Sequence, residues 1–261
     1  MKILAISNQK GGVGKTTTTV NLAASLVSLG YRVLLVDADP QGNASSSFGL
    51  DVSAVPYTLY PVIMEQVELS EAIIHNVWEH LDLVAASPDL AGAEVELVPE
   101  MARELRLRRA LQSVAGQYDI VLLDCPPSLG LLTLNALVAA TGTLIPMQCE
   151  YFAMEGLSHL LRTIELVKSH LNPQLAIDGI LLTMFDMRNN ICHQVAEDIT
   201  AHFGWAVFET VIPRNVRLSE APSFGLPVVA YAGESRGAVC YQALARELSS
   251  RLSLVQQAVA G

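Results

Sequence analysis

The feature that most restricts how this chain can fold is a glycine-rich loop between an apolar run and a helical stretch. Ile3 to Ser7 has the pattern of a short buried strand, and Thr16 to Leu29 that of an amphipathic helix ending at Gly30. Glycines in such a loop let consecutive backbone N–H groups turn inward around phosphate oxygens. The whole loop is predicted to bind nucleotide: Lys10, Gly11, Gly12, Val13, Gly14, Lys15, Thr16 and Thr17.

Two side chains of the loop carry the chemistry that a nucleoside triphosphate requires. Lys15 is placed to reach the β- and γ-phosphates, and the hydroxyl of Thr16 is placed to ligate Mg²⁺. The N-terminus of the following helix adds a partial positive charge at the same point. The sequence therefore predicts an ATPase with ATP and Mg²⁺ as its ligands.

Composition limits the class of protein around this loop. The chain has 261 residues, of which 51% are hydrophobic and 16% charged, so it can bury a sheet on both faces, and we expect one domain over residues 1–261. The formal net charge of -10 argues against a protein that coats DNA through its overall field, so any DNA contact must be local. Four cysteines without C-x-x-C spacing favour a reduced, cytoplasmic protein.

Hydrophobic patterning predicts an α/β fold, a doubly wound and mostly parallel sheet flanked by helices, because short β-branched runs alternate with longer helical stretches. The predicted strands are Ile3–Ser7, Val33–Asp37, Leu81–Ala85, Ile120–Asp124, Thr143–Met147, Ile177–Thr183 and Val207–Ile212. The predicted helices are Thr16–Leu29, Arg103–Val114, Leu131–Ala140, Glu155–His170, Ile191–Phe203 and Gly237–Leu252. Ligands of such sheets collect where the strands end at their carboxyl edge.

Acidic residues follow two of these strands. Asp37 and Asp39 come at the end of one apolar run, and Asp124 ends Ile120-Val121-Leu122-Leu123, which has the form of a Walker B strand. The carboxylate at that position usually holds Mg²⁺ through water. Each aspartate alone could be a turn or capping residue, but their combination with the loop favours a site for hydrolysis.

The loop departs from the general G-x-x-x-x-G-K-[ST] pattern because Gln9 stands where the first glycine would be. With Lys10 opening the loop, the segment resembles the deviant Walker A motif of the ParA/MinD/nitrogenase-iron-protein superfamily, in which this second lysine crosses a dimer interface to the partner's phosphates. The stretches DADPQGNASSSFGL, LAGAEVELVPE, DCPPSLGLLTLNAL, QCEYFAMEGLSHLL and VIPRNVRLSEAPSFGLPV resemble chromosomal ParA proteins of the Soj type.

That resemblance implies an ATP-dependent sandwich homodimer that binds double-stranded DNA without sequence preference, on the nucleoid. Release follows when a ParB-type partner stimulates hydrolysis, so that chromosomes or plasmids are segregated. The resemblance makes Lys10, Lys15 and Asp39 catalytic, with Asp39 orienting the attacking water, and it gives Asp37 a place in the magnesium shell beside Thr16 and Asp124. It also implies nucleotide contacts by Glu150, Met184, Pro213, Arg214 and Asn215, and DNA contacts by Arg188, Arg214, Arg217 and Arg236.

Other classes remain as alternatives. A MinD-like membrane-cycling ATPase needs a basic amphipathic C-terminal helix, whereas residues 246–261 carry little basic charge and no aromatic residue. An iron–sulfur reductase needs cysteines placed to hold a cluster, and a metabolic P-loop transferase needs an acceptor pocket; neither arrangement is visible. No run of apolar residues is long enough to span a membrane. Since the first predicted strand begins the sequence, we expect no N-terminal DNA-reading domain.

Overall fold

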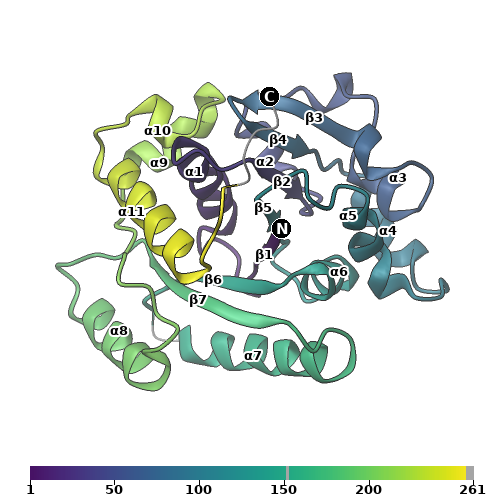
Figure 1. Cartoon of the computed structure of the whole chain (residues 1–261). Coiled ribbons are helices and arrows are strands. Elements are labelled where there is room, and N and C mark those ends of the chain that lie inside the picture. The colour runs from purple at the N-terminus through teal and green to yellow at the C-terminus, as the bar shows by residue number, and fades with distance from the viewer. Residues whose placement is uncertain (151–152, 257–261) are drawn as a thin grey trace.

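The computed structural model describes residues 1–150 and 153–256, and its centre is a seven-stranded sheet in the order β3-β4-β2-β5-β1-β6-β7 (Figure 1). The strands are β1 (Lys2–Ile6), β2 (Val33–Asp37), β3 (Ile73–Trp78), β4 (Leu81–Val84), β5 (Ile120–Asp124), β6 (Gly142–Gln148) and β7 (Ala176–Thr183). All neighbouring pairs are parallel except β3 with β4. The predicted doubly wound, mostly parallel sheet is therefore confirmed.

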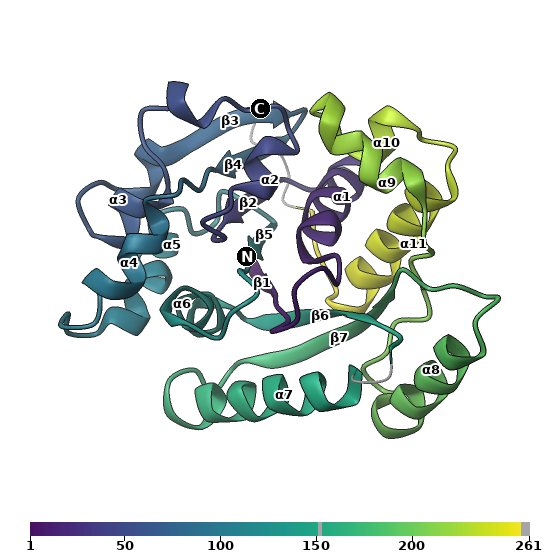
Figure 2. The ribbon, with the colours of Figure 1, turned by 180° about the vertical axis from the view of Figure 1, so that it is seen from behind.

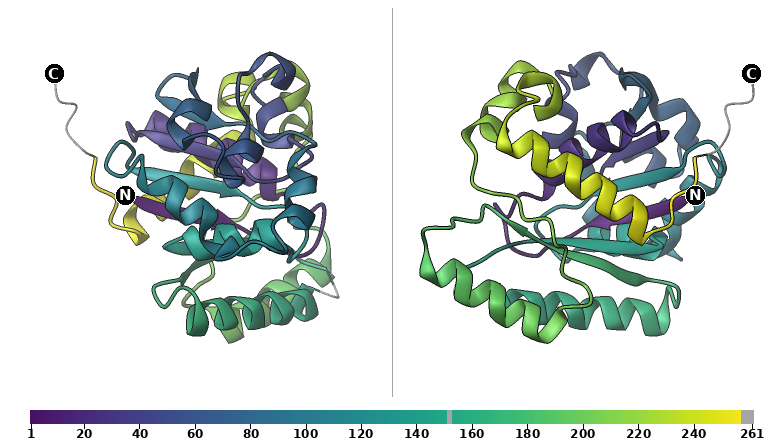
Figure 3. Two further views of the ribbon diagram at one scale, coloured as in Figure 1. Left: turned by 90° about the vertical axis from the view of Figure 1, so that its right-hand side faces the viewer. Right: turned by 60° about the vertical axis from the view of Figure 1, so that its left-hand side comes forward.

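Helices cover both faces of the sheet. They are α1 (Lys15–Ser28), α2 (Asn43–Ser46), α3 (Leu59–Ile63), α4 (Leu90–Glu96), α5 (Arg106–Gln112), α6 (Leu131–Ala139), α7 (Ala153–His170), α8 (Asn190–Phe203), α9 (Val216–Glu220), α10 (Val228–Tyr231) and α11 (Arg236–Arg251). In the right-hand view of Figure 3, α11 runs along the outside of one layer. In Figure 2, α8 lies beside α7, away from α3 to α5.

Alternate residues of each strand point to different helix layers, as expected for a sheet buried on both faces. Leu4 and Ile6 of β1 join a core with α1 and α11, whereas Ala5 between them joins a core with α3 to α7. In β2, likewise, Leu35 faces the first core and Leu34 the second. The strands at the centre are therefore fixed by packing from both sides.

Strand register determines which side chains meet at the carboxyl edge. Ile6 at the end of β1 pairs with Asp124 at the end of β5, and Asp37 at the end of β2 pairs with the same Asp124. The glycine-rich loop begins after β1, which lies directly beside β5, the central strand of these three. The loop and two of the predicted acidic strand ends therefore converge on one point.

The predicted strand Val207–Ile212 is wrong: this segment forms only isolated bridges, Ile180 with Val207 and Phe185 with Pro213. The reason lies in the competing side chain of Glu247, which accepts hydrogen bonds from the backbone N–H groups of Glu209 and Thr210, both at 2.9 Å. Amides that bind a carboxylate cannot continue a ladder with the neighbouring strand.

Conversely, β3 was not predicted, although it forms one edge of the sheet. Its residues are half-buried or exposed, so the alternation that marks a buried strand is weak, and its pairing with β4 is interrupted between Ile74 and Trp78. In the described residues no helix is both long enough and apolar enough to cross a membrane. Residues 257–261 of the tail considered for the MinD-like alternative, and residues 151 and 152, lie outside the described part.

Candidate functional site

The glycine-rich loop is held open by backbone conformations that favour glycine. Gly12 and Gly14 have φ values of 74° and 84°, in the left-handed region, and Gly14 is the N-cap residue of α1. Neighbouring strands fix the loop: Thr183 donates through Oγ1 to the carbonyl of Val13 at 2.8 Å, and Asn8 donates to the carbonyl of Pro146 at 2.7 Å. The loop is thus a rigid turn with α1's N-terminal amides directed toward its interior.

Lys15 lies buried against this loop. Its Nζ donates to the carbonyl of Lys10 at 3.1 Å, so the ammonium group lies across the loop. Bound phosphates would contact it there. Burial lowers the pKa of Lys15, and the nearby charge of Asp124 partly offsets that effect. The arrangement places one buried cation where anionic oxygens would gather.

Asp37 and Asp124 form the acidic side of the site, and both are fully buried. Oδ2 of Asp37 accepts hydrogen bonds from the backbone N–H of Ser45 at 2.8 Å and from its hydroxyl at 2.7 Å. Oδ1 of Asp124 accepts from the Thr19 hydroxyl at 2.8 Å, while its Oδ2 is buried without a hydrogen-bond partner among the described residues. A buried carboxylate oxygen that accepts no hydrogen bond is a suitable ligand for a divalent cation or for water coordinated to it.

The charge state of this pair reflects that burial. Removal from water raises the pKa of Asp124, and the neighbouring charge of Asp37 raises it further, while the hydroxyls of Thr19 and Thr16 act in the opposite direction. Burial also raises the pKa of Asp37, against the hydrogen bonds from Ser45. Thr16, Asp37 and Asp124, the three predicted magnesium residues, are therefore gathered around one site, in which two buried carboxylates lie near one lysine, Lys15.

Asp39 follows the same strand end in a tight turn. Its Oδ1 accepts from the backbone N–H of Gln41 at 3.0 Å, and its own N–H donates to Oδ1 of Asp37 at 3.3 Å. The side chain is buried and its charge acts on Lys15, so Asp39 lies near the phosphate loop but outside the Asp37–Asp124 pair. Such a carboxylate is suitably placed to accept a proton from a water molecule or to orient it.

Beyond the loop lies a cavity of about 220 Å³. It is lined by Gly14, Thr17, Thr183, Met184, Ile212, Pro213, Arg214, Asn215, Leu218, Ser219, Pro222 and Tyr241. The structure thus brings together four of the residues predicted to contact the nucleotide, Met184, Pro213, Arg214 and Asn215, directly beside the phosphate loop. The mixture of apolar side chains with a few polar groups fits a planar heterocycle.

Sequence reasoning missed several residues of this site. Tyr241 lines the cavity from α11 and its hydroxyl lies 3.2 Å from Oγ1 of Thr18, but a lone tyrosine in a helical pattern gives no signal of such a contact. Ser45 and Thr19, which bind the two buried carboxylates, were likewise missed. The spacing of Thr19 from Lys15, one helical turn, was the one available signal.

Lys10 and Glu150, both predicted to act across a dimer, form an ion pair with each other within this chain. Their side chains are 42% and 52% exposed, so the pair is open to solvent and to replacement by other partners. The structure therefore brings together the two residues at the mouth of the site.

Three of the four predicted DNA-binding arginines lie near one segment. Nη2 of Arg236 lies 3.2 Å from Sδ of Met187, next to Arg188, and the charge of Arg214 helps to lower the pKa of Asp186. Arg188 itself pairs with Asp186, with Nε 3.2 Å from Oδ1. Arg217 lies on α9 and pairs with Glu220 at 2.8 Å, so two of the four charges are partly neutralised within the chain.

Comparison with known proteins gives consistent results. Residues 1–177 match the family described as "AAA domain". The "Chromosome partitioning protein ParA" of Myxococcus xanthus is 56% identical over 250 residues, which cover 96% of this chain and 88% of that protein. The "Sporulation initiation inhibitor protein Soj" of Bacillus subtilis is 54% identical over 249 residues, 95% of this chain and 98% of that protein.

Among solved structures, one described as a cobyrinic acid a,c-diamide synthase from Mycobacterium smegmatis with bound ATP analog and magnesium superposes with a TM-score of 0.85. It is 37% identical and covers 99% of this chain and 100% of its own.

Proposed function

Because this chain belongs to the ParA/Soj family of chromosome-partitioning ATPases, we propose that it works as an ATP-dependent dimeric switch on DNA. The chain is an ATPase, and its ATP form pairs with a second copy, binds double-stranded DNA without sequence preference, and returns to the monomer when a ParB-type partner stimulates hydrolysis. In its ATP-bound, dimeric state the protein associates with the nucleoid. Its cargo is a chromosome or a plasmid; relatives that are named chromosome partitioning proteins support the chromosome.

The observation that carries the proposal is the convergence of four elements at one edge of the sheet. The phosphate loop, the buried Lys15, the Asp37–Asp124 pair and the cavity around Met184 are continuous with one another. Together they fit the parts of Mg-ATP. The loop amides and Lys15 bind the phosphates, the carboxylates bind the cation, and the cavity holds the base.

The fit to magnesium rests on the unpartnered Oδ2 of Asp124 in the described structure. We assign Thr16 and Asp124 to the cation, with Asp37 supporting its water shell. Bound Mg²⁺ supplies charge neutralisation at the β- and γ-phosphates. Lys15 binds the same phosphates, and Asp39 orients the attacking water through a carboxylate that the turn at Gln41 holds in place.

Dimerisation is assigned to Lys10 because its side chain is exposed and, among the described residues, is held only by Glu150. An exposed pair of this kind contributes about 1 kcal/mol at most, so a partner's phosphates can replace Glu150 at small cost. The second copy also doubles the arginine surface, which consists of the four predicted DNA-binding residues Arg188, Arg214, Arg217 and Arg236. On a chain of net charge -10, that doubling makes DNA affinity depend on the nucleotide state.

The test is retention of the purified protein on random duplex DNA with ATP, with ADP and without nucleotide, each titrated with salt. Only the ATP state is expected to bind, with steep salt dependence, and Arg217→Glu is expected to abolish binding. Arg246→Glu is the matched control, since Arg246 is an exposed arginine of α11 outside the arginine surface. DNA binding that is equal in all three nucleotide states would contradict the switch.

A further inference from the structure

Three large apolar side chains at the end of α4 and just after it are exposed to solvent. Val95, Val98 and Met101 are 73%, 56% and 89% exposed, and we refer to them as the apolar patch. The backbone N–H of Val98 donates to the carbonyl of Val95 at 3.1 Å, a turn in which residues three apart lie on one side. In Figure 1 the segment after α4 lies at the right-hand edge of the ribbon. Exposed apolar side chains that lie together can form an interaction surface.

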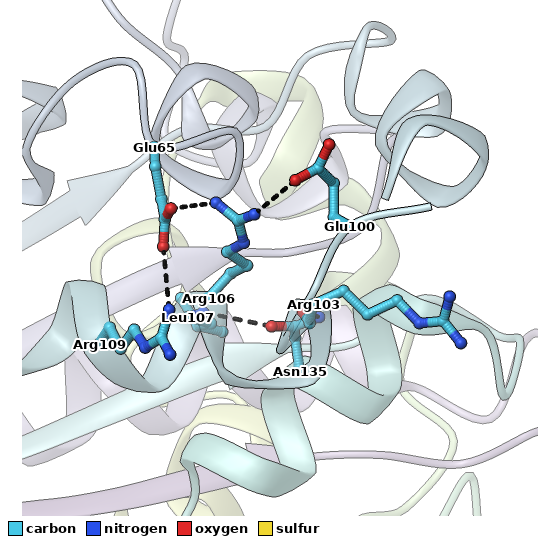
Figure 4. A network of polar contacts seen from close by, with 7 residues as sticks. All are labelled: Glu65, Glu100, Arg103, Arg106, Leu107, Arg109 and Asn135. Carbon is cyan, nitrogen blue, oxygen red and sulfur yellow. Dashed lines mark hydrogen bonds and ion pairs between the residues drawn. The ribbon is translucent and has the colours of Figure 1, made fainter. Parts of the chain in front are cut away.

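The segment that carries the apolar patch is braced rather than loose. Arg106 of α5, whose side chain is only 9% exposed, binds Glu65 through one nitrogen and Glu100 through Nη2 at 3.0 Å (Figure 4). Arg109 lies 3.5 Å from the other oxygen of Glu65. Glu100 immediately precedes Met101, so the buried guanidinium fixes the chain at the edge of the patch, and docking there needs little ordering.

The same segment is attached to the helix that follows the Asp124 strand. Gly130, the N-cap residue of α6, offers no side chain, and Glu94 supplies the missing acceptor: its Oε1 lies 3.4 Å from the backbone N of Leu132. Asn135 of α6 accepts from the N–H of Leu107 at 3.2 Å and donates to the carbonyl of Arg103 at 2.9 Å. A displacement of the patch is therefore carried to α6.

The charge around the patch identifies its partner. Of the five acidic residues between positions 89 and 104, Glu100 and Glu104 are paired with Arg106 and Arg103, whereas Asp89, Glu94 and Glu96 form no ion pair among the described residues. In a two-fold symmetric contact between copies, this surface would face itself and bring like charges together, which is unfavourable. A basic segment with apolar side chains, by contrast, matches both the sign of the charge and the exposed side chains.

We propose that the apolar patch docks a basic, apolar-anchored segment of the partner protein that stimulates hydrolysis, and that Glu94 transmits this docking to α6 and the Asp124 strand end. The inference rests on the proposed function, because it assumes that a ParB-type partner acts on this ATPase. It adds the place of contact and the route by which contact reaches the nucleotide site.

The experiment uses the full chain and the full-length ParB-type protein encoded in the same genome. Val98→Lys/Met101→Lys is compared with the wild type and with a control double variant, Leu166→Lys/Val255→Lys, whose positions are 54% and 77% exposed. The patch variant is expected to bind the partner at least about tenfold more weakly and to lose stimulation, since two apolar contacts are replaced by repulsive charge. Its basal ATPase rate and its ATP-dependent DNA binding stay unchanged, as does the control.

A second comparison isolates the transmission step. Glu94→Ala removes the acceptor at the start of α6, so partner affinity should stay within about twofold while stimulation is lost; Glu94→Gln retains an acceptor oxygen and restores stimulation. Full stimulation of Glu94→Ala would refute the route through α6.

The outcomes separate the two proposals. If the wild type is not stimulated at all, the proposed function fails. If the wild type and the patch variant are stimulated equally, only the docking site fails. If the patch variant loses ATP-dependent dimerisation in the absence of the partner, the patch is a contact between copies and the inference is overturned.

Discussion

Asp37 and Asp124 are direct register partners at the carboxyl ends of β2 and β5, so two fully buried carboxylates lie side by side next to the phosphate loop. Without a cation this arrangement is unfavourable, because each charge has left water and faces a like charge. The site is therefore less stable empty than filled, and this difference can be measured.

Asp124→Asn should raise the thermal stability of the metal-free, nucleotide-free protein at pH 7.5. The pKa of Asp124 is raised from 3.8 to about 7, so the folded state retains a proton that the unfolded chain releases, and stability falls as the pH rises through that interval. The variant lacks this loss, and its Tm should exceed that of the wild type by about 3 °C or more. Thermal melts in EDTA from pH 4 to 8 test this, with the exposed Asp198→Asn as control; a difference that persists at pH 4 would contradict the account.

Lys15→Ala and Lys10→Ala should separate binding from dimerisation. Lys15 lies buried across the loop, so its loss should weaken ATP binding about 100-fold or more, as expected for a desolvated charge contact with phosphates. Lys10 is exposed and pairs only with Glu150 among the described residues, so its variant should bind ATP normally but remain monomeric. Fluorescent-nucleotide titration and light scattering with ATP measure the two properties. Normal dimer formation by Lys10→Ala would remove Lys10 from the interface.

Asp39→Ala should trap the ATP-bound dimer. The turn at Gln41 holds the Asp39 carboxylate beside the loop but outside the Asp37–Asp124 pair, so its removal should spare binding and slow hydrolysis about 100-fold or more. Phosphate release and dimer lifetime are the measurements. A hydrolysis rate equal to that of the wild type would assign the water to another residue.

Ser219→Trp should close the cavity beside the phosphate loop. Ser219 is exposed and lines the cavity of about 220 Å³, so an indole ring there would occupy the space that we assign to adenine. The Kd for ATP should rise at least about tenfold, while that for tripolyphosphate, which needs only the loop, stays the same. Ser250→Trp on the exposed end of α11 is the control. Equal losses for both ligands would mean that the loop itself has been disturbed.

Asp186→Asn and Glu220→Gln should strengthen DNA binding by the ATP form. Each removes the carboxylate that pairs with a predicted DNA-binding arginine, Arg188 or Arg217. Exposed pairs of this kind are weak because solvent screens them, so the expected affinity gain is small, about two- to fivefold. Filter binding at several salt concentrations measures the change. A gain that also appears with ADP would reflect net charge rather than the switch.

The sequence predicted the parts of this molecule that depend on local pattern. The bounds of Val33–Asp37 and Ile120–Asp124 agree with β2 and β5, because continuous apolar runs buried on both faces have few alternatives. The loop and its flanking elements agree for the same reason. The prediction failed for Val207–Ile212, where the contact that decides the structure comes from Glu247, far along the chain.

The candidate site shows the same division. Lys15, Thr16 and Asp124 could be identified because each ends or follows a recognisable element. Ser45 and Tyr241 could not, since their roles depend on tertiary contacts with Asp37 and with the cavity. Met184 and residues 213–215 were identified only through resemblance to a family, and the structure supplies the cavity that unites them.

The two ends of the nucleotide site are made at very different times during protein synthesis. The phosphate loop is complete at Thr17, whereas the cavity wall is complete only with Tyr241. β1 itself lies between β5 and β6, so the first strand to leave the ribosome must wait for residues up to Gln148 before it has neighbours on both sides. A nascent or truncated chain therefore carries the phosphate loop without the cavity wall, and its contacts with a nucleotide would be limited to those of the loop.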